Sequence, residues 1–137
     1  MPVKLRKPVI EVGIVTDDGA RTLRFYRDLL GFPVEREIPF PGLGVITRLQ
    51  VGDTALRVLT LENPASEHAS SRGFASQTGF RYINLTVTNL REIVDEVSAA
   101  GFPVPTQPRE VRSGTLVAQI EDGQGNTVEL TQHGESS

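Results

Sequence analysis

The sequence predicts an α+β fold made of two tandem βαβββ modules. The tetrapeptide Gly-Phe-Pro-Val occurs at 31–34 and again at 101–104. A pattern of apolar residues with helical period precedes each copy, at 20–30 and at 90–100. Short alternating runs typical of strands surround both helical segments. A main alternative, a single βαββαβ domain, would leave several of these predicted strands without a place.

Length and composition favour one domain. The chain has 137 residues, of which 38% are hydrophobic, which suffices for one core but not for two ordinary domains. We expect a single domain over 1–137. It divides into a first module at about 8–62, a linker at about 63–78, a second module at about 79–132 and a tail at 133–137.

Charge and residue usage narrow the possible partners. With 14 basic and 17 acidic residues the net charge is -3, and the absence of a basic stripe argues against nucleic acid. The chain has no cysteine, which excludes disulfides, thiolate metal sites and a cysteine nucleophile. Glu11 interrupts the apolar N-terminal run, no cleavage site follows, and no run is long enough to span a membrane. We therefore expect a cytoplasmic protein with no membrane partner.

Both helical segments are amphipathic. Their inward faces carry Leu23, Tyr26 and Leu30 in the first and Ile93, Val97 and Ala100 in the second. Phe25 and Tyr26 are interpreted as core or dimer contacts.

Each helix has a start signal in the sequence. Asp17 and Asp18 precede the first helix. Asn89 precedes the second, and Glu92 follows three residues later, as in a capping box.

Both helices share the same stop signal. Gly31 and Gly101 can adopt the left-handed conformation that closes a helix, whereas Pro33 and Pro103 cannot continue one. The repeated tetrapeptide is therefore a helix-ending motif used once in each module.

Strand side chains alternate between two faces. The first strand of each module therefore has one apolar face that packs in the core and an opposite face that can carry functional residues. In 81–88 the core side carries Ile83, Leu85 and Val87, and the opposite side carries Tyr82, Asn84 and Thr86. In 9–16 the core side carries Ile10, Val12 and Ile14, and the opposite side carries Glu11, Gly13 and Val15. Glu11 and Tyr82 thus occupy equivalent positions.

Three further strands follow each helix. We expect them at 34–40, 44–51 and 54–61 in the first module and at 104–108, 114–120 and 126–132 in the second. Hairpin signals lie at Gly52-Asp53 and in the glycine-rich turn at 122–126. The last strands place Leu56, Val58, Val128 and Leu130 in the core, so that Arg57 and Glu129 lie on the opposite face.

The polar segment from Glu62 to Gly79 joins the modules. A segment of this length is either a linker or a mobile cover over a site, and we favour the linker because any tandem repeat needs a connection. His68 lies in this segment, where a solvated role is the default.

Two stretches resemble a known family. The run FYRDLLGF at 25–32, with the strand and Asp18 before it, and EDGQGNTVEL at 121–130 resemble the vicinal oxygen chelate superfamily. That superfamily contains glyoxalase I, methylmalonyl-CoA epimerase, extradiol dioxygenases, and fosfomycin and bleomycin resistance proteins. The resemblance implies that the modules form a cupped mixed sheet and that the chain pairs as a homodimer. It does not imply one reaction, since this fold hosts unrelated chemistries.

The resemblance also implies where a site would lie. Metal-dependent members carry ligands on the inner face of the first and last strands of each module, and those positions hold Glu11, Arg57, Tyr82 and Glu129. Arg57 always keeps its proton and Tyr82 is a poor ligand at neutral pH, so no tight metal site is predicted. If a weakly bound Mg²⁺ or Mn²⁺ is present, Glu11 and Glu129 would hold it with water.

Several functions remain open for these four residues. Arg57 could form a structural ion pair with the carboxylates, or it could anchor an anionic or carbonyl oxygen of a ligand. In the second case Glu129 and Glu11 would transfer a proton, Tyr82 would donate to a developing oxyanion, and Asn84 and Thr86 would bind substrate. This predicts an isomerase, epimerase or lyase that acts on a small carbonyl or carboxylate compound. The alternatives are a non-catalytic binding protein like the bleomycin-binding relatives, although aromatic residues form only 6% of the chain, or a weakly metal-dependent glyoxalase- or dioxygenase-like enzyme.

Overall fold

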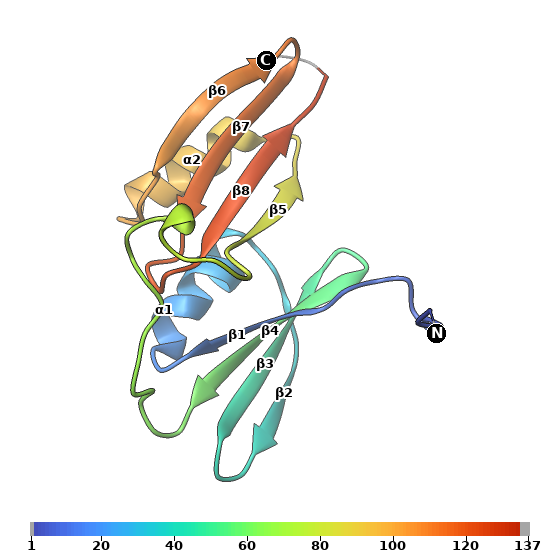
Figure 1. The fold of residues 1–137 in the computed structure, drawn as a ribbon, viewed down its shortest axis with the longest axis vertical. Coiled ribbons are helices and arrows are strands. Elements are labelled where there is room, and N and C mark those ends of the chain that lie inside the picture. Colours follow the sequence, from blue (N-terminus) through green and yellow to red (C-terminus); the bar gives the residue numbers. More distant parts are fainter. Residues whose placement is uncertain (1, 135–137) are drawn as a thin grey trace.

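The computed structural model describes residues 2–134, so the last three residues of the expected tail lie outside the described part. The chain forms the expected βαβββ units in tandem (Figure 1). The first unit consists of β1 (Val12–Thr16), α1 (Gly19–Leu23), η1 (Arg24–Leu29), β2 (Val34–Phe40), β3 (Gly44–Val51) and β4 (Thr54–Leu61). After the short helix η2 (Phe74–Ser76), the second consists of β5 (Tyr82–Thr86), α2 (Leu90–Ala99), β6 (Thr106–Arg112), β7 (Thr115–Glu121) and β8 (Thr127–Gln132).

The two sheets have the same topology, which confirms the predicted repeat and the α+β class. Their strand orders are β1-β4-β3-β2 and β5-β8-β7-β6. In each sheet the first strand runs parallel to the last and the remaining neighbours are antiparallel. The sheets lie at opposite ends of the long axis in Figure 1, with β1 and β5 as the edge strands nearest the middle.

The bounds of β1 and β6 differ most from those predicted. The first begins at Val12 rather than at residue 9, and Ile10, expected in the core, is 81% exposed. Its would-be neighbour on β4 is Thr54, the first residue of that strand, so the sheet ends there. β6 begins two residues later than predicted and continues to Arg112, and Pro108 lies within an irregularity of its pairing, as expected for proline on an edge strand.

The first helix is capped as predicted but changes type along its length. The Asp18 side chain accepts a hydrogen bond from the backbone nitrogen of Arg21 at 3.2 Å. From Arg24 the helix widens to π geometry, in which the backbone nitrogen of Leu30 donates to the Phe25 oxygen at 2.9 Å. The consecutive residues Phe25 and Tyr26 are both completely buried, whereas the expected Leu23 and Leu30 are only half-buried.

The predicted capping box at the start of α2 is wrong. Asn89 occupies the N-cap position, but its side chain makes no capping hydrogen bond. Instead the backbone nitrogen of Leu90 donates to Oε1 of Gln132 on β8, at 2.9 Å. A tertiary contact therefore satisfies one of the free backbone nitrogens at this helix start.

The helix-ending motif behaves as predicted. Gly31 has a φ of 78° and Gly101 a φ of 89°, the left-handed conformation that side chains disfavour.

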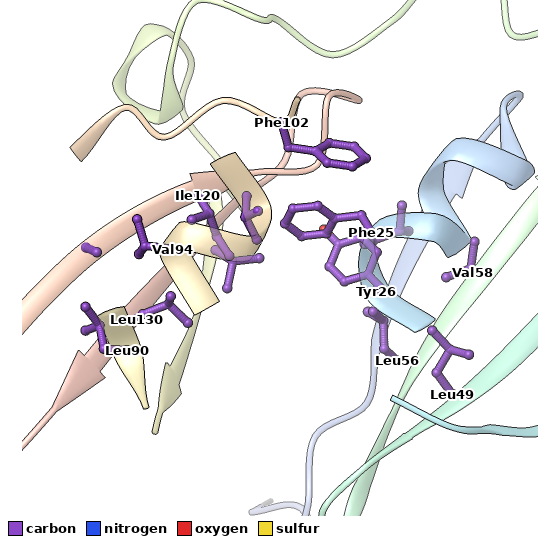
Figure 2. Packing of buried hydrophobic residues seen from close by; sticks show 14 of the residues in the cluster. Phe25, Tyr26, Leu49, Leu56, Val58, Leu90, Val94, Phe102, Ile120 and Leu130 are labelled. Carbon is purple, nitrogen blue, oxygen red and sulfur yellow. The ribbon is translucent and has the colours of Figure 1, made fainter. Parts of the chain in front are cut away.

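A continuous core joins the two modules through their helices (Figure 2). Phe25 contacts Tyr26 and Phe102 edge-on, with ring centroids 4.8 and 5.1 Å apart. The guanidinium of Arg21 covers the Phe102 ring at 4.7 Å. Figure 2 shows these rings between a cluster that contains Leu56 and Val58 and one that contains Ile120 and Leu130. Leu56, Val58, Val128 and Leu130 are buried as predicted.

Candidate functional site

The candidate site residues lie on the sheet faces that point away from the helices. On the first sheet the pairing places Gly13 beside Arg57 and Arg57 beside Arg48. On the second it places Asn84 beside Glu129. The burial pattern along β4, β5 and β8 confirms the predicted alternation between a core face and an open face.

Glu11 is held by an arginine that the sequence analysis did not single out. Both Glu11 carboxylate oxygens accept from Arg48, Oε1 from Nη1 at 2.5 Å and Oε2 from Nη2 at 2.8 Å. The side chains are only 15% exposed for Arg48 and 25% for Glu11. Lys7 adds a weaker contact to Oε2 at 3.5 Å. The hydrogen bonds from Arg48 outweigh desolvation and lower the pKa of Glu11 to about 2.

Arg48 binds a second carboxylate, that of Glu35, through its Nε. Hydrogen bonds to Glu11 and then to Glu35 raise the pKa of Arg48 above its ordinary value. Each of the three guanidinium nitrogens of Arg48 thus donates a hydrogen bond to a carboxylate of the protein.

Arg57 is not the ion-pair partner of the two predicted carboxylates. Its side chain is exposed, and within residues 2–134 no carboxylate oxygen lies within 4.0 Å of it. The structural ion pair that was one alternative for Arg57 is instead made by Arg48. The turn at Gly52-Asp53 indicates that Arg48 lies beside Arg57. A two-residue hairpin that pairs Val51 with Thr54 also pairs Arg48 with Arg57.

Glu129 and Asn84 form a second group, on the other sheet. The Asn84 amide nitrogen donates to Oε1 of Glu129 at 2.9 Å and to Oγ1 of Thr131 at 2.8 Å. Glu129 is half-buried, and within the described residues its Oε2 has no hydrogen-bond partner. Thr86 is exposed on the same strand face, beside Thr131.

Tyr82 connects this face to the segment between the modules. Its side chain is 53% exposed, and its ring contacts Phe74 of η2 edge-on with centroids 5.6 Å apart. A cavity of about 90 Å³ lies between β1 and β5 and has both Gly13 and Tyr82 in its wall. A second cavity, of about 130 Å³, has Ala55 and Asn84 in its wall. These two cavities mark a seam between the first strands of the modules.

The structure brings the candidate residues together in two groups rather than one. Asn84, Glu129 and Tyr82 share a face of the second sheet, whereas Arg57 and Arg48 share a face of the first, where Arg48 binds Glu11. In the part of the chain that the structure describes, no hydrogen bond or ion pair joins the two groups.

The donor set does not fit a divalent cation. Glu11 is occupied by Arg48, Glu129 lies on the other sheet, and residues 2–134 contain no group of three histidine or acidic side chains that could hold a metal. Arg48 is the register partner of Arg36 on β2 and of Arg57 on β4, and this positive charge makes the first sheet unfavourable for a cation.

The segment between the modules is fastened to the first one. Nε2 of His68 lies 2.8 Å from Oδ2 of Asp17, which also accepts from the backbone nitrogen of Ala65 at 3.1 Å. The hydrogen bond from His68, and then that from Ala65, lowers the pKa of Asp17. A cavity of about 230 Å³ lies under the segment, beside β1. This histidine, expected to be solvated, thus has a specific partner although its side chain is 65% exposed.

Among the described residues, no helix is long and apolar enough to cross a membrane.

Comparison with known proteins agrees with this architecture. A profile of the Glyoxalase/Bleomycin resistance protein/Dioxygenase superfamily matches residues 9–130. A search of curated proteins found no match. Among solved structures, a glyoxalase family protein from Enterococcus faecalis is 23% identical, with a TM-score of 0.71 over 92% of this chain and 98% of that one. A glyoxalase family protein from Bacillus cereus is 15% identical, with a TM-score of 0.79 over 96% of both chains.

A longer chain contains the same fold. A variant of glyoxalase I from Zea mays is 18% identical, with a TM-score of 0.75 over 91% of this chain but only 44% of that one. These likenesses show the fold alone. The profile match over residues 9–130 establishes that the chain belongs to the glyoxalase/bleomycin resistance protein/dioxygenase superfamily.

Proposed function

We propose that this protein binds a small carbonyl- or carboxylate-containing molecule between the open faces of its sheets and catalyses proton transfer next to the carbonyl, as an isomerase, epimerase or lyase. The observation that carries this proposal is the Glu129 carboxylate. One of its oxygens is fixed by Asn84 at 2.9 Å, and neither oxygen is neutralised by a basic side chain of the described chain. A carboxylate held in one orientation with a free oxygen is suited to act as a general base.

The other residues supply binding and charge stabilisation. Arg57, which has no carboxylate partner, anchors a carboxylate or carbonyl oxygen by charge-assisted hydrogen bonds. Tyr82, in the wall of the seam cavity, donates its O–H to oxygen as negative charge develops there. Asn84 orients Glu129, and Thr86 provides a further hydroxyl on the same face.

Glu129, Arg57 and Tyr82 account for the movement of the proton and of the negative charge in this reaction. Oε2 of Glu129 takes the proton from the carbon next to the carbonyl, and the electron pair of that C–H bond moves to the carbonyl oxygen, giving an enolate near Arg57 and Tyr82. Return of a proton to the opposite face of the carbon gives the epimer. In a hydroxy ketone, the hydroxyl proton moves to the former carbonyl oxygen, and return of the abstracted proton to the other carbon of the enediolate then gives the isomer. No oxidant or reductant is needed.

Glu11 takes a different part in this proposal from that suggested by position alone. The bidentate contact with Arg48 keeps its pKa at about 2, so Glu11 remains ionised at neutral pH and has no free oxygen for a proton. We assign it the role of holding Arg48 in place.

A non-catalytic binding function has a specific observation in its favour. Phe80 is fully exposed and shares a cavity wall with Phe74 and Tyr82. Three aromatic side chains at one edge of β5 form a platform on which a planar ligand can stack. This alternative requires ligand binding without turnover.

The open edges of β1 and β5 support a homodimer with two equivalent sites, since each strand has a neighbour on only one side. The chain spans 44% of the maize protein, so a second copy would supply the remaining modules. The ligand would bind between the face that bears Arg57 and the face that bears Glu129, either of the same chain or of the partner. The same residues contact the ligand in both arrangements.

The catalytic proposal is tested by proton exchange. Wild-type protein, Glu129→Gln and the control Glu96→Gln, which changes an exposed residue of α2, are incubated with 2-oxobutyrate in D₂O, and loss of the C3 proton signal is followed by NMR. We expect exchange above the uncatalysed rate with wild type and Glu96→Gln, and a loss of about 100-fold or more with Glu129→Gln. Unchanged exchange by Glu129→Gln contradicts the role of this residue, and binding without exchange by wild type favours the binding alternative.

A further inference from the structure

We infer that Arg36, Arg48 and Arg57 form an anion-binding row on the open face of the first sheet, and that the ligand is an organic dianion with one anionic group at Arg57 and the other at Arg36. This inference rests on the proposed function in one respect, the use of Arg57 as an anchor. It adds a second anchoring residue and narrows the ligand to a dicarboxylate.

The pairing of three adjacent strands creates the row. Arg36 of β2 is the register partner of Arg48 of β3, and Arg48 is the register partner of Arg57 of β4. Directly paired residues of antiparallel strands project from the same face. The strand pairing has a β-bulge between Val34 and Arg36, where Glu35 is the extra residue. Both Glu35 and Arg36 therefore lie opposite Arg48.

The charges in this row are unequally compensated. Like charges on directly opposite residues destabilise a sheet unless something neutralises them. Arg48, at the centre, has the carboxylates of both Glu11 and Glu35. Arg36 and Arg57 on either side are exposed, and within residues 2–134 neither has a carboxylate oxygen within 4.0 Å. Positive charge therefore remains at the two ends of the row.

The spacing suits a short molecule with two charged ends. Neighbouring strands lie about 4.8 Å apart, so the backbones of Arg36 and Arg57 are separated by about 10 Å, and their flexible side chains can lean towards each other. The planar guanidinium matches the two oxygens of a carboxylate. A chain of four to six carbons can thus reach both ends and pass over the neutralised centre.

An apolar row beside the arginines fits the middle of such a ligand. Ile38 pairs with Ile46, and Ile46 pairs with Leu59, two positions along the strands from the arginine row and on the same face. Ile46 is buried, and the other two side chains are half-buried. Methylene groups between two carboxylates can pack against this row while the charges remain on the arginines.

The test compares a dicarboxylate with a monocarboxylate that shares its reactive end. Binding of 2-oxoglutarate and of 2-oxobutyrate is measured by calorimetry for wild type, Arg36→Gln, Arg57→Gln and the control Arg91→Gln, an exposed arginine of α2 on the other module. Circular dichroism verifies that each variant is folded.

We expect wild type to bind 2-oxoglutarate more tightly than 2-oxobutyrate by about tenfold or more. Arg36→Gln should remove this preference and leave 2-oxobutyrate binding unchanged, Arg57→Gln should weaken both, and Arg91→Gln should alter neither. If Arg36→Gln retains the preference while Arg57→Gln weakens both ligands, the row is refuted and the proposed function stands. If wild type binds neither ligand, both proposals are refuted.

Discussion

The hydrogen bond between Tyr26 and Asp122 joins the two modules, and its removal by substitution tests how much this contact stabilises the fold. Tyr26 belongs to η1 of the first module and Asp122 to the turn after β7 of the second, and both are completely buried. The Tyr26 hydroxyl donates to Oδ2 of Asp122 at 2.8 Å. Replacement by phenylalanine removes this oxygen and preserves the ring that contacts Phe25.

The expected loss of stability follows from what remains around Asp122. Its Oδ1 still accepts from the backbone nitrogens of Gln124 at 2.7 Å and Asn126 at 3.2 Å, and Oδ2 from the Asn126 amide at 2.8 Å. One buried hydrogen bond to a charged acceptor contributes about 2 kcal/mol to the free energy of unfolding. With an unfolding entropy of about 2.1 cal/mol/K per residue, this corresponds to a decrease in Tm of about 7 °C.

Urea denaturation at pH 7 measures the free energy of unfolding, and calorimetry measures Tm. Tyr82→Phe is the matched control, since the Tyr82 hydroxyl has no hydrogen-bond partner in the described chain, and it should change stability by less than about 0.5 kcal/mol. Asp122→Asn, combined with Tyr26→Phe in a double-mutant cycle, should show a coupling energy of about 1 kcal/mol. Tyr26→Phe with the stability of wild type would refute the proposed link between the modules.

Two further predictions concern the first sheet. Because the pKa of Glu11 is lowered from 4.5 to about 2 in the folded protein, its ion pair stabilises the fold fully above pH 4.5 and loses this contribution as the pH falls towards 2. The stability difference between wild type and Arg48→Gln should therefore shrink between pH 4.5 and 2 in urea titrations, and a constant difference would contradict the pairing. A Cβ on Gly44 would lie 2.0 Å from the backbone oxygen of Thr60, so Gly44→Ala should lower the free energy of unfolding by more than about 2 kcal/mol. Gly42→Ala meets no atom and should cost only about 1 kcal/mol for its positive φ, so equal losses in the two variants would refute the close approach of β3 to β4.

Much of the fold could be predicted because it is specified locally. The bounds of β2, β3 and β4 follow from alternation and from the turn at Gly52, and the helix ends follow from Gly31 and Gly101. Such signals depend on neighbours within a few residues, and so they can be read from one sequence.

The features that were missed depend on contacts between distant residues. Gln132 caps α2 across 42 positions of sequence, and the π turn of η1 occurs where both Phe25 and Tyr26 are buried in the core between the modules. A distant partner can satisfy one of the free backbone nitrogens at a helix start, and nothing in the local sequence indicates it.

For the candidate site, the alternation of side chains along the strands predicted which face each residue lies on, but not which residue it contacts. It placed Arg57 and Glu129 on open faces, as the pairing of the strands shows, whereas Glu11 lies just before β1 and contacts Arg48. It did not identify Arg48 as the partner of Glu11, because that choice depends on a β3 side chain that the comparison of first and last strands left out.

The central claim is that Arg57 on one sheet and Glu129 on the other act on the same ligand. The most direct measurement is an NMR titration of ¹⁵N-labelled protein with 2-oxoglutarate, in which the backbone amides of both residues are followed. The account predicts that both amides shift with one Kd and that Arg57→Gln weakens the two responses together. Shifts confined to one sheet, or two different dissociation constants, would contradict it.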